Sequence, residues 1–406
     1  MKILYVSEAY LPDLGGIAAV IENFTQGLAA EGHDVHLWTR SHQPKSYTET
    51  HGGVTIHYQR STPYPLSSGH RVTVGVRAGL AAIVADWQPD VIHAHIFPSP
   101  ITAAAITYGK KHHIPVVITN HAMPENYRNV VDFRLPAAAE KLIFPIGWKW
   151  LVGICNQATF VTTPTPTALS YLTDNGLKRP GLAISNGIDT DMYRPGPDVP
   201  ELRRKWRLPS DKPLMLYLGR LDGEKMVEII IQALPQLQHS YHLVIAGGGN
   251  NERQLKALTR KLKLSKHVTF TGLVSAADKV RLYQMADLFV IASPAELQSL
   301  VTLEAMSCHL PVVAVNAGAL DELCHDGTNG EIFALNDSTD LAGKLDKLLS
   351  NPELRLQYGQ ASRRIVEKSH SLHGTILAYQ SVYQQLIATQ IETAAARSRR
   401  ALSGKL

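Results

Sequence analysis

The chain has 406 residues, which is long for one domain and sufficient for two that each bury their own core. Hydrophobic residues make up 45% and charged residues 18%, which excludes a disordered chain and indicates an ordinary globular protein. The formal net charge of +5 is small for this length, so no nucleic-acid partner is required and we expect none.

The cysteines and the first residues bear on the compartment. The three cysteines, Cys155, Cys308 and Cys324, show no paired metal-ligand spacing and no even number, so we expect reduced thiols. The first apolar run soon reaches Glu8 and Asp13, which predicts a first strand rather than a signal peptide. No apolar stretch is long enough to span a bilayer. These features predict a cytoplasmic protein.

Strand and helix patterns alternate in the first half of the chain. We predict strands at Ile3–Val6, Val35–Thr39, Val54–Tyr58, Val91–His95, Val116–Thr119, Thr159–Thr163 and Leu182–Ser185. Helical spacing of apolar residues predicts helices at Ile17–Ala30, Val72–Trp87 and Ile101–Lys111. Such alternation is typical of a parallel sheet covered by helices on both faces.

A glycine pair, Gly15 and Gly16, stands between the first predicted strand and the first predicted helix. Glycine lets the backbone approach a ligand closely because it has no Cβ. In open parallel sheets, ligands bind where strand ends lead into helix starts. We therefore expect this pair to border a ligand.

The stretch Asn186–Pro197, NGIDTDMYRPGP, is dense in turn residues and breaks the alternation, so we place the domain boundary there. The predicted domains are residues 1–190 and 191–370. After Gln390 the chain has little to bury, and we expect residues 391–406 to form a frayed basic tail with Arg397, Arg399, Arg400 and Lys405.

A second alternating series follows the boundary. We predict strands at Leu214–Leu218, Leu243–Ala246, Val268–Thr271, Leu288–Ala292 and Pro311–Val315. Predicted helices are Val227–Leu237, Gln254–Leu262, Ala277–Met285, Ser338–Leu349, Pro352–Glu367 and Gly374–Thr389, with a further helix after the last strand-end loop. The fold class is therefore α/β, with two doubly wound Rossmann-like domains facing a central cleft.

Charged side chains occupy two strand-to-helix loops of the second series. Arg220 and Lys225 follow one strand, and two cations there can hold a diphosphate and offset negative charge on a departing phosphate. Glu296 follows another strand, and Glu304 comes eight residues further on, inside a segment with helical spacing. Each group alone is compatible with a solvated surface. Their convergence at strand ends favours one anion-binding site.

The helix that carries Glu304 begins near Ser299. The first N–H groups of a helix have no partner inside it and attract anions, so Leu300 and Val301 are candidate donors to a phosphate.

Three other motifs have competing explanations. Asp189 and Asp191 form a DxD that can hold a metal, but their place in the linker favours a turn and helix cap. His93 and His95 point to one face of a strand without a third ligand at suitable spacing, so we expect them to border the cleft. Gly247–Gly249 lacks the full dinucleotide-binding spacing. No metal site is predicted.

The chain resembles, over nearly its whole length, the retaining nucleotide-sugar-dependent glycosyltransferases of family 4, also described as glycosyl transferases group 1, which have the GT-B architecture. The most specific shared mark is Glu296, seven residues and Glu304, with EAM beginning at Glu304. Further matches are the glycine pair before the first helix, NGID in the linker, GRLDGEK, VIAGGG and VTFTGLV.

This resemblance implies roles for individual residues. It implies catalytic roles for Arg220, Lys225, Glu296 and His121, with the two cations on the diphosphate and the other two near the transferred sugar. It also implies donor contacts at Gly15, Gly16, Gly272, Val274, Leu300, Val301 and Glu304, of which Glu304 holds the ribose and residues 272–274 the base. A nucleotide diphosphate sugar is then the donor substrate, no cofactor is needed, and the last helix, about 371–390, completes the N-terminal domain.

Three departures from the family pattern stand out. Leu297–Ser299 replaces an aromatic residue and a glycine after the first glutamate, so we expect a different sugar pocket. Met226 stands where many members have glycine, so a tight turn must be made in another way. Leu372 or His373 replaces the aromatic residue at the start of the last helix.

The segment Asn126–Cys155 mixes basic and aromatic residues. It can lie in an anionic lipid surface or can pack as the helix that closes the N-terminal domain, and the second alternative is favoured. The predicted acceptor is a hydroxyl group, on a membrane lipid or an envelope glycan, with peripheral contact to the plasma membrane. The alternatives are a soluble glycosyltransferase that acts on small molecules or polysaccharides, and a sugar-nucleotide-binding protein without transfer activity.

Overall fold

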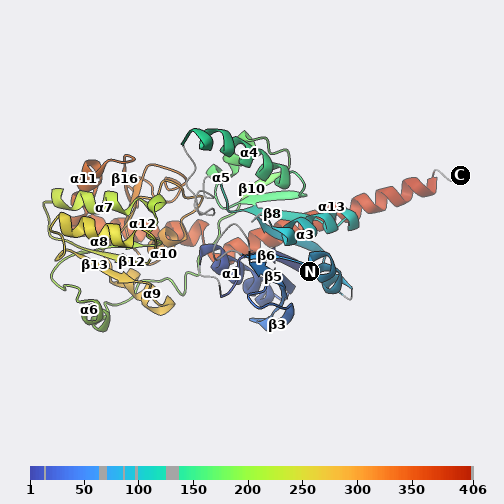
Figure 1. Cartoon of the computed structure of the whole chain (residues 1–406), viewed down its shortest axis with the longest axis horizontal. Helices are drawn as coiled ribbons and strands as arrows, with labels where there is room; N and C mark the ends of the chain where they lie inside the picture. The colour runs from blue at the N-terminus through green and yellow to red at the C-terminus, as the bar shows by residue number, and fades with distance from the viewer. Residues whose placement is uncertain (13–14, 64–70, 86, 97–98, 125–136, 404–406) are drawn as a thin grey trace. The chain divides into compact units, whose positions relative to one another are not determined.

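The structure, a computed structural model of the chain, describes every residue except 13–14, 64–70, 86, 97–98, 125–136 and 404–406 (Figure 1). The chain divides into two compact units. Unit 1 consists of Met1–Ser185 and His373–Leu406, and unit 2 is Asn186–Leu372. The predicted domain boundaries at residues 190 and 370 lie within a few residues of the two points where the chain passes from one unit to the other.

Unit 1 contains an eight-stranded sheet in the order β10-β9-β8-β7-β1-β2-β4-β3. Neighbouring strands are parallel except β3 and β4, which are antiparallel. The strands are β1 (Lys2–Ser7), β2 (Asp34–Arg40), β3 (Tyr47–His51), β4 (Val54–Gln59), β7 (Val91–Ile96), β8 (Val116–Asn120), β9 (Phe160–Thr163) and β10 (Gly181–Ala183). A separate antiparallel pair joins β5 (Ser61–Pro63) and β6 (Arg71–Thr73). The predicted parallel sheet is confirmed.

The helices of unit 1 are α1 (Gly16–Ala30), α2 (Val76–Val84), α3 (Pro100–His112), α4 (Ala137–Cys155), α5 (Pro166–Asp174) and α13 (Leu372–Ser403). α5 was not predicted from the sequence. Its signal was the pair Thr165-Pro166, because the Thr165 hydroxyl accepts the amide of Ala168 and Pro166 stands at the first helical position. Ser99 and Pro100 begin α3 in the same way.

The last helix is longer than predicted. α13 continues to Ser403 instead of ending near residue 389, so the expectation of a frayed tail was wrong for its backbone. Its final turns are rich in Ala and Arg, which favour helix without needing burial. Tyr379 and Tyr383 bury against the sheet, and the C-terminal half of the helix extends beyond the strands (Figure 1). The side chains from 394 onward lie outside the described residues.

Unit 2 contains a six-stranded parallel sheet in the order β13-β12-β11-β14-β15-β16. The strands are β11 (Leu214–Leu218), β12 (His242–Ala246), β13 (Val268–Gly272), β14 (Leu288–Ile291), β15 (Val312–Val315) and β16 (Gly330–Phe333). The strand order reverses between β11 and β14, as in the Rossmann fold. In unit 1 the corresponding reversal lies between β1 and β7. Two doubly wound α/β units are therefore confirmed.

Helices cover both faces of the unit 2 sheet. They are α6 (Pro200–Trp206), α7 (Val227–Ala233), α8 (Glu252–Lys261), α9 (Ala276–Met285), α10 (Leu300–Ser307), α11 (Ser338–Leu349) and α12 (Pro352–Ser369), with the 3₁₀ turns η2 (Gly223–Lys225) and η3 (Leu234–Gln236). The strands read as continuous apolar runs because both faces are buried, as the residues of β11, β12 and β14 are.

The glycine run Gly247–Gly249 has a packing explanation. A Cβ at Gly247 would lie 1.9 Å from the carbonyl oxygen of Gly219, and one at Gly249 would lie 2.7 Å from the backbone of Leu221. The loops after β11 and β12 thus touch backbone to backbone. In the linker, Asp189 Oδ1 accepts the amides of Asp191 and Met192 at 2.9 Å, which confirms the predicted turn.

Candidate functional site

The reversal of strand order in unit 2 brings two predicted loops together. β11 and β14 are neighbours, so the loops at their carboxyl ends meet at the position where doubly wound sheets bind ligands. Lys225 comes from the first loop and Glu296 from the second. The Nζ of Lys225 lies 2.7 Å from Oε1 of Glu296 and 3.4 Å from Oγ of Ser293. The structure therefore joins these two predicted residues in one ion pair.

This ion pair is largely shielded from water and still has capacity for a ligand. An ammonium group has three N–H donors and a carboxylate has two oxygens, so neither group is saturated by the other. Below the pair, the Tyr217 hydroxyl donates to the carbonyl oxygen of Arg220 at 2.9 Å. The pKa of Tyr217 is raised, first by burial and then by the charge of Glu296. The phenol therefore remains neutral beneath the ion pair.

Arg220 lies on the outer side of the same loop. Its side chain is 63% exposed, and its guanidinium donates to Asp222 and Glu224. Asp222 also accepts the amide of Asn250 at 3.0 Å, which ties the loop to the neighbouring strand end. The two carboxylates hold the guanidinium in one orientation, but they also compensate its charge. The structure does not bring Arg220 into contact with Lys225.

Met226 makes the turn that glycine makes in many family members. It has φ 51° and ψ 36°, in the left-handed region, between η2 and α7. This conformation is unfavourable for a residue with a side chain. Partial packing of Met226 against the core of unit 2 accompanies it. Met226 therefore makes the tight turn after Lys225 itself.

The start of α10 completes this end of the sheet. Ser299 caps the helix, with its hydroxyl 3.3 Å from the amide of Thr302. The amides of Leu300 and Val301 in the first turn have no acceptor among the described residues. These two N–H groups and the positive end of the helix dipole suit an anion.

A glycine supports the loop that carries Glu296. Gly318 has φ +63°, and a Cβ there would lie 2.8 Å from the carbonyl oxygen of Glu296 and 3.0 Å from that of Pro294. The same carbonyl of Glu296 accepts the amide of Ala319 at 3.0 Å. The loop after β15 therefore holds the Glu296 loop by direct backbone contact.

The Leu297–Ser299 departure has structural contacts of its own. Leu297 is buried, and Gln298 accepts the amide of Asn186 through Oε1 at 2.8 Å. Ser299 caps α10 as described above. Gln298 thus ties the loop of Glu296 to the first residue of unit 2, a contact that the sequence analysis did not find. No local pattern reveals a bond between residues this far apart in the chain.

Glu304 lies in the second turn of α10 and is almost completely buried. Both of its oxygens have partners on α9: Lys279 Nζ lies 2.7 Å from Oε1, and the Tyr283 hydroxyl donates to Oε2 at 2.8 Å. The pKa of Tyr283 is raised, first by burial and then by Glu304. Glu304 was predicted from the sequence, but Lys279, which lies in no motif, was not.

The base contacts implied by the resemblance fall on the loop between β13 and α9. Gly272 ends β13 with φ +70°, and its carbonyl oxygen accepts the amide of Gly247 at 2.9 Å. Val274 follows it and is partly buried against the core of unit 2. This loop therefore lies beside the loop after β12 and leads directly into the helix that carries Lys279.

In unit 1, His121 lies directly after β8. Its Nε2 is 2.8 Å from Nδ1 of His95, and the two rings stack with centroids 5.0 Å apart. Burial lowers the pKa of His121 to about 4, so the ring is neutral at pH 7. A neutral imidazole there can donate or accept a hydrogen bond without carrying charge.

The prediction that His93 and His95 border a cleft was wrong. Both are buried within unit 1, because helices cover both faces of β7. Tyr379 of α13 packs against His93. His93 bonds the hydroxyls of Tyr383 at 2.5 Å and Thr119 at 2.6 Å. Burial lowers the pKa of both histidines. They therefore belong to a buried polar network between the sheet and α13.

The glycine pair lies at the start of α1, where the chain leaves β1. Gly15 precedes the helix and Gly16 is its first residue, and no described side chain forms a capping hydrogen bond at this end. In the described part of the chain, no atom outside its immediate neighbours lies within 4 Å of a Cβ placed at Gly15. Among the described residues, the space at the Gly15 Cβ position is therefore unfilled.

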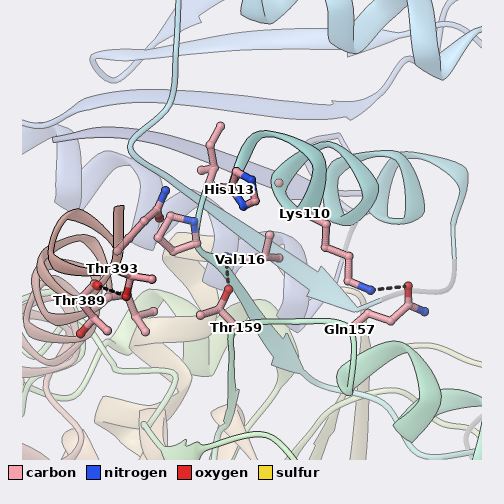
Figure 2. Close-up of a pocket in the computed structure, with 12 residues that line it drawn as sticks. Lys110, His113, Val116, Gln157, Thr159, Thr389 and Thr393 are labelled. Atoms are coloured by element: carbon pink, nitrogen blue, oxygen red, sulfur yellow. Dashed lines mark hydrogen bonds between the residues drawn. The ribbon is translucent and has the colours of Figure 1, made fainter. Parts of the chain in front are cut away.

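A separate cavity of about 590 Å³ lies in unit 1 beside the start of β8, at the other end of that strand from His121 (Figure 2). It is lined by Gly109, Lys110, His113, Ile114, Pro115, Val116, Gln157, Thr159, Leu386, Thr389, Gln390 and Thr393. Val116 begins β8, whereas His121 follows its end. The cavity is therefore not part of the predicted site.

Part of the basic and aromatic segment 126–155 can be described. Residues 126–136 lie outside the described residues, and side chains are described from Ile143 onward. On α4, Leu151 and Val152 pack into the core of unit 1, whereas Ile143, Ile146 and Trp150 are exposed. The helix thus has one packed face and one apolar exposed face. Among the described residues, no helix is both long and apolar enough to cross a membrane.

Comparison with known proteins adds family information. Residues 14–192 match the family model described as Glycosyltransferase Family 4, and residues 198–365 match the one described as Glycosyl transferases group 1. The gap between the two matches falls on the linker. Between them, the two models account for most of the chain.

Relatives and solved structures cover nearly the full length. An alpha-monoglucosyldiacylglycerol synthase from Acholeplasma laidlawii is 28% identical over 367 residues, 87% of this chain and 89% of the relative. A glycogen synthase from Mycobacterium tuberculosis is 28% identical over 411 residues, 94% of each chain. The structure of Anabaena HepE in complex with UDP and glucose superposes with a TM-score of 0.75 at 19% identity, covering 95% of this chain and 100% of that one.

Proposed function

The chain belongs to the glycosyltransferases of group 1, with the GT-B fold, and on that premise we propose that it transfers a hexosyl unit from a nucleotide diphosphate sugar to a hydroxyl acceptor. The proposal includes retention of the anomeric configuration and activity without a metal or cofactor. One observation carries it: the ion pair of Lys225 and Glu296 stands at the strand-order reversal, beside the open amides of Leu300 and Val301.

The proposed roles in the donor site follow from charge and position. Lys225, Arg220 and the α10 amides hold the diphosphate, because cations and helix N-termini stabilise phosphate oxygens. Glu296 accepts hydrogen bonds from sugar hydroxyls, and Glu304 accepts them from the ribose. Residues 272–274 contact the base. In unit 1, the amides of Gly15 and Gly16 and the neutral His121, which follow β1 and β8, are the proposed contacts of the sugar and the acceptor.

The proposed reaction needs no carboxylate nucleophile. The bond from the anomeric carbon to the diphosphate oxygen breaks, and the acceptor oxygen bonds to the same face of that carbon. The acceptor's proton passes to the departing diphosphate oxygen. Lys225 and Arg220 stabilise the negative charge that this oxygen gains, and a preorganised charge aimed at a leaving group lowers the barrier most.

The test is to incubate the protein with UDP-, GDP- and ADP-sugars and measure the free nucleoside diphosphate, with and without acceptor. HepE, whose structure holds UDP and glucose, makes UDP-glucose the first donor to try. Transfer that persists in EDTA and gives an α-linked product from an α-linked donor supports the proposal. Binding of a nucleotide sugar without any release of nucleoside diphosphate supports instead a binding protein without transfer activity.

For the acceptor we propose a membrane lipid or envelope glycan, reached by peripheral contact with the inner face of the plasma membrane. The Acholeplasma relative is named for a glycolipid product. On α4, Ile143, Ile146 and Trp150 form an exposed apolar stripe with Lys149 also exposed, and such a stripe suits an anionic lipid surface. The unpaired state of the three buried cysteines fits the proposed cytoplasmic location.

The similarity to a glycogen synthase keeps a polysaccharide acceptor as the second candidate. Product analysis with diacylglycerol lipids and with oligosaccharides, each offered alone, separates the two.

A further inference from the structure

Glu304 and Lys279 form an ion pair that the family motifs do not contain. The pair joins two helices, since Glu304 lies on α10 and Lys279 on α9, and its atoms are 2.7 Å apart. Tyr283, one turn after Lys279 on the same face of α9, donates to the other oxygen of Glu304. One face of α9 therefore donates a hydrogen bond to each oxygen of the Glu304 carboxylate.

The two partners differ in their access to solvent. The side chain of Glu304 is 9% exposed, whereas that of Lys279 is 27% exposed. The ammonium also lies over the ring of Tyr193, 5.2 Å from its centroid, which is a cation–π contact. Lys279 is therefore the more solvent-accessible partner of the pair.

Both groups retain hydrogen-bonding capacity. The ammonium has three N–H donors, and Glu304 accepts the only one for which the described residues provide a hydrogen bond. Each carboxylate oxygen has two lone pairs; Lys279 and Tyr283 occupy one apiece, and the Tyr193 hydroxyl also interacts with this carboxylate. An unused acceptor and an unused donor thus stand side by side.

The pair offers a hydrogen-bond donor and an acceptor to the same ligand. A hydroxyl group fits it, because one hydroxyl can donate to the carboxylate while its oxygen accepts from the ammonium. Vicinal hydroxyls, as in the diol of a ribose, use both groups together.

We propose that Lys279 is a nucleotide-binding residue. Its ammonium donates a hydrogen bond to a ribose hydroxyl, and that hydroxyl donates a hydrogen bond to Glu304. This inference rests on the proposed function, which places the donor ribose at Glu304. Lys279 also follows the loop 272–274, to which the proposed function assigns the base, so α9 would contact two neighbouring parts of the nucleoside. The pair then makes the site select ribose over deoxyribose.

The test compares Lys279→Met with wild type by calorimetry. The probes are UDP, GDP and ADP, followed by the 2′-deoxy and 3′-deoxy forms of whichever binds most tightly. We expect Lys279→Met to weaken binding of the ribonucleotide about tenfold. Binding of at least one deoxy form should change much less, so the preference for ribose falls. Lys279→Arg, which keeps charge and donors, should restore part of that preference.

The control is Lys256→Met, because Lys256 forms a 2.6 Å ion pair with Glu252 within α8, a more exposed pair away from Glu304. It should bind all nucleotides as wild type does. Thermal unfolding of each variant confirms that it is folded.

The remaining outcomes overturn the inference. Equal weakening for ribose and deoxyribose forms, or unchanged or tighter binding by Lys279→Met, makes the ion pair a purely structural contact. If wild type binds none of the three nucleoside diphosphates, the proposed function fails and this inference fails with it. If wild type binds and transfers but the variant keeps the full preference for ribose, only this inference fails.

Discussion

The ammonium of Lys225 and the carboxylate of Glu296 lie 2.7 Å apart although the residues are 71 positions apart in the chain. They meet because β11 and β14 are neighbours and both loops leave the same edge of the sheet. The contact places a cation and an anion side by side at the start of α10. A donor with a negative diphosphate and neutral hydroxyls has complementary groups for each of them.

Removing either partner should abolish most of the transfer activity. We expect Lys225→Ala and Glu296→Gln each to lower kcat about a hundred- to thousandfold, or about 3 to 4 kcal/mol, the usual effect of losing one preorganised group. Neither side chain belongs to the hydrophobic core, so both variants should remain folded. Steady-state kinetics and circular dichroism measure the two effects.

Lys256→Ala is the control for that experiment, since it breaks an ion pair on α8 without touching the site. Rates near wild type for either Lys225→Ala or Glu296→Gln would remove the main support for the proposed site.

Gly318→Ala should impair the enzyme through the backbone alone. At φ +63° an alanine is strained by about 1 kcal/mol, and its Cβ would also collide with the carbonyl oxygen of Glu296 at 2.8 Å. The Glu296 loop must then shift, so we expect a lower kcat/KM as well as a lower unfolding temperature.

Gly327→Ala is a control that has the backbone strain at positive φ without the collision with Glu296. Gly327 has φ +73°, but no described atom outside its neighbours lies within 4 Å of a Cβ there. It should lose stability to a similar extent while keeping its kcat/KM. Equal kinetics for the two variants would show that the contact with Glu296 has no bearing on activity.

The buried histidine network should make the fold acid-sensitive. Burial lowers the pKa of His93 from 6.5 to about 3. As the pH falls below 6.5, the unfolded chain takes up a proton at this residue and the folded protein does not. The free energy of unfolding should therefore fall by about 1.4 kcal/mol per pH unit from this group, down to about pH 3.

His93→Gln tests this by removing the titrating group while keeping an amide that can bond Tyr383 and Thr119. Urea unfolding at a series of pH values between 7 and 4 should show a shallower decline for the variant than for wild type. The contributions of His95, of His121 and of the carboxyl groups remain in both curves. Parallel curves would mean that His93 is protonated in the folded protein.

Contact with lipid should depend on the exposed stripe of α4. We expect Ile146→Asp to lower binding to anionic phosphatidylglycerol vesicles about tenfold at low salt, because an apolar side chain of this size contributes about 1.5 to 3 kcal/mol when buried. Leu356→Asp on α12 is the matched control, since both residues are 62% exposed. If the two variants sediment with vesicles equally, α4 is not the docking surface.

The sequence determined the class of fold through local patterns. Apolar runs such as Leu214–Leu218 and Leu288–Ala292 mark strands buried on both faces, and the helices between them show apolar periodicity. Family motifs also marked Glu296, Glu304 and Lys225. Two helical segments were not predicted. One is the short helix α5, and the other is the end of α13, whose residues favour helix without burial.

Only the tertiary structure decided which of these residues meet. Strand order places β11 beside β14, and no local periodicity encodes that order, so the ion pair of Lys225 and Glu296 could not be read from the chain. The same holds for Lys279 on Glu304 and for Gln298 on Asn186. His93 was misjudged for a related reason: its burial comes from α13, which returns from the far end of the sequence to cover β7.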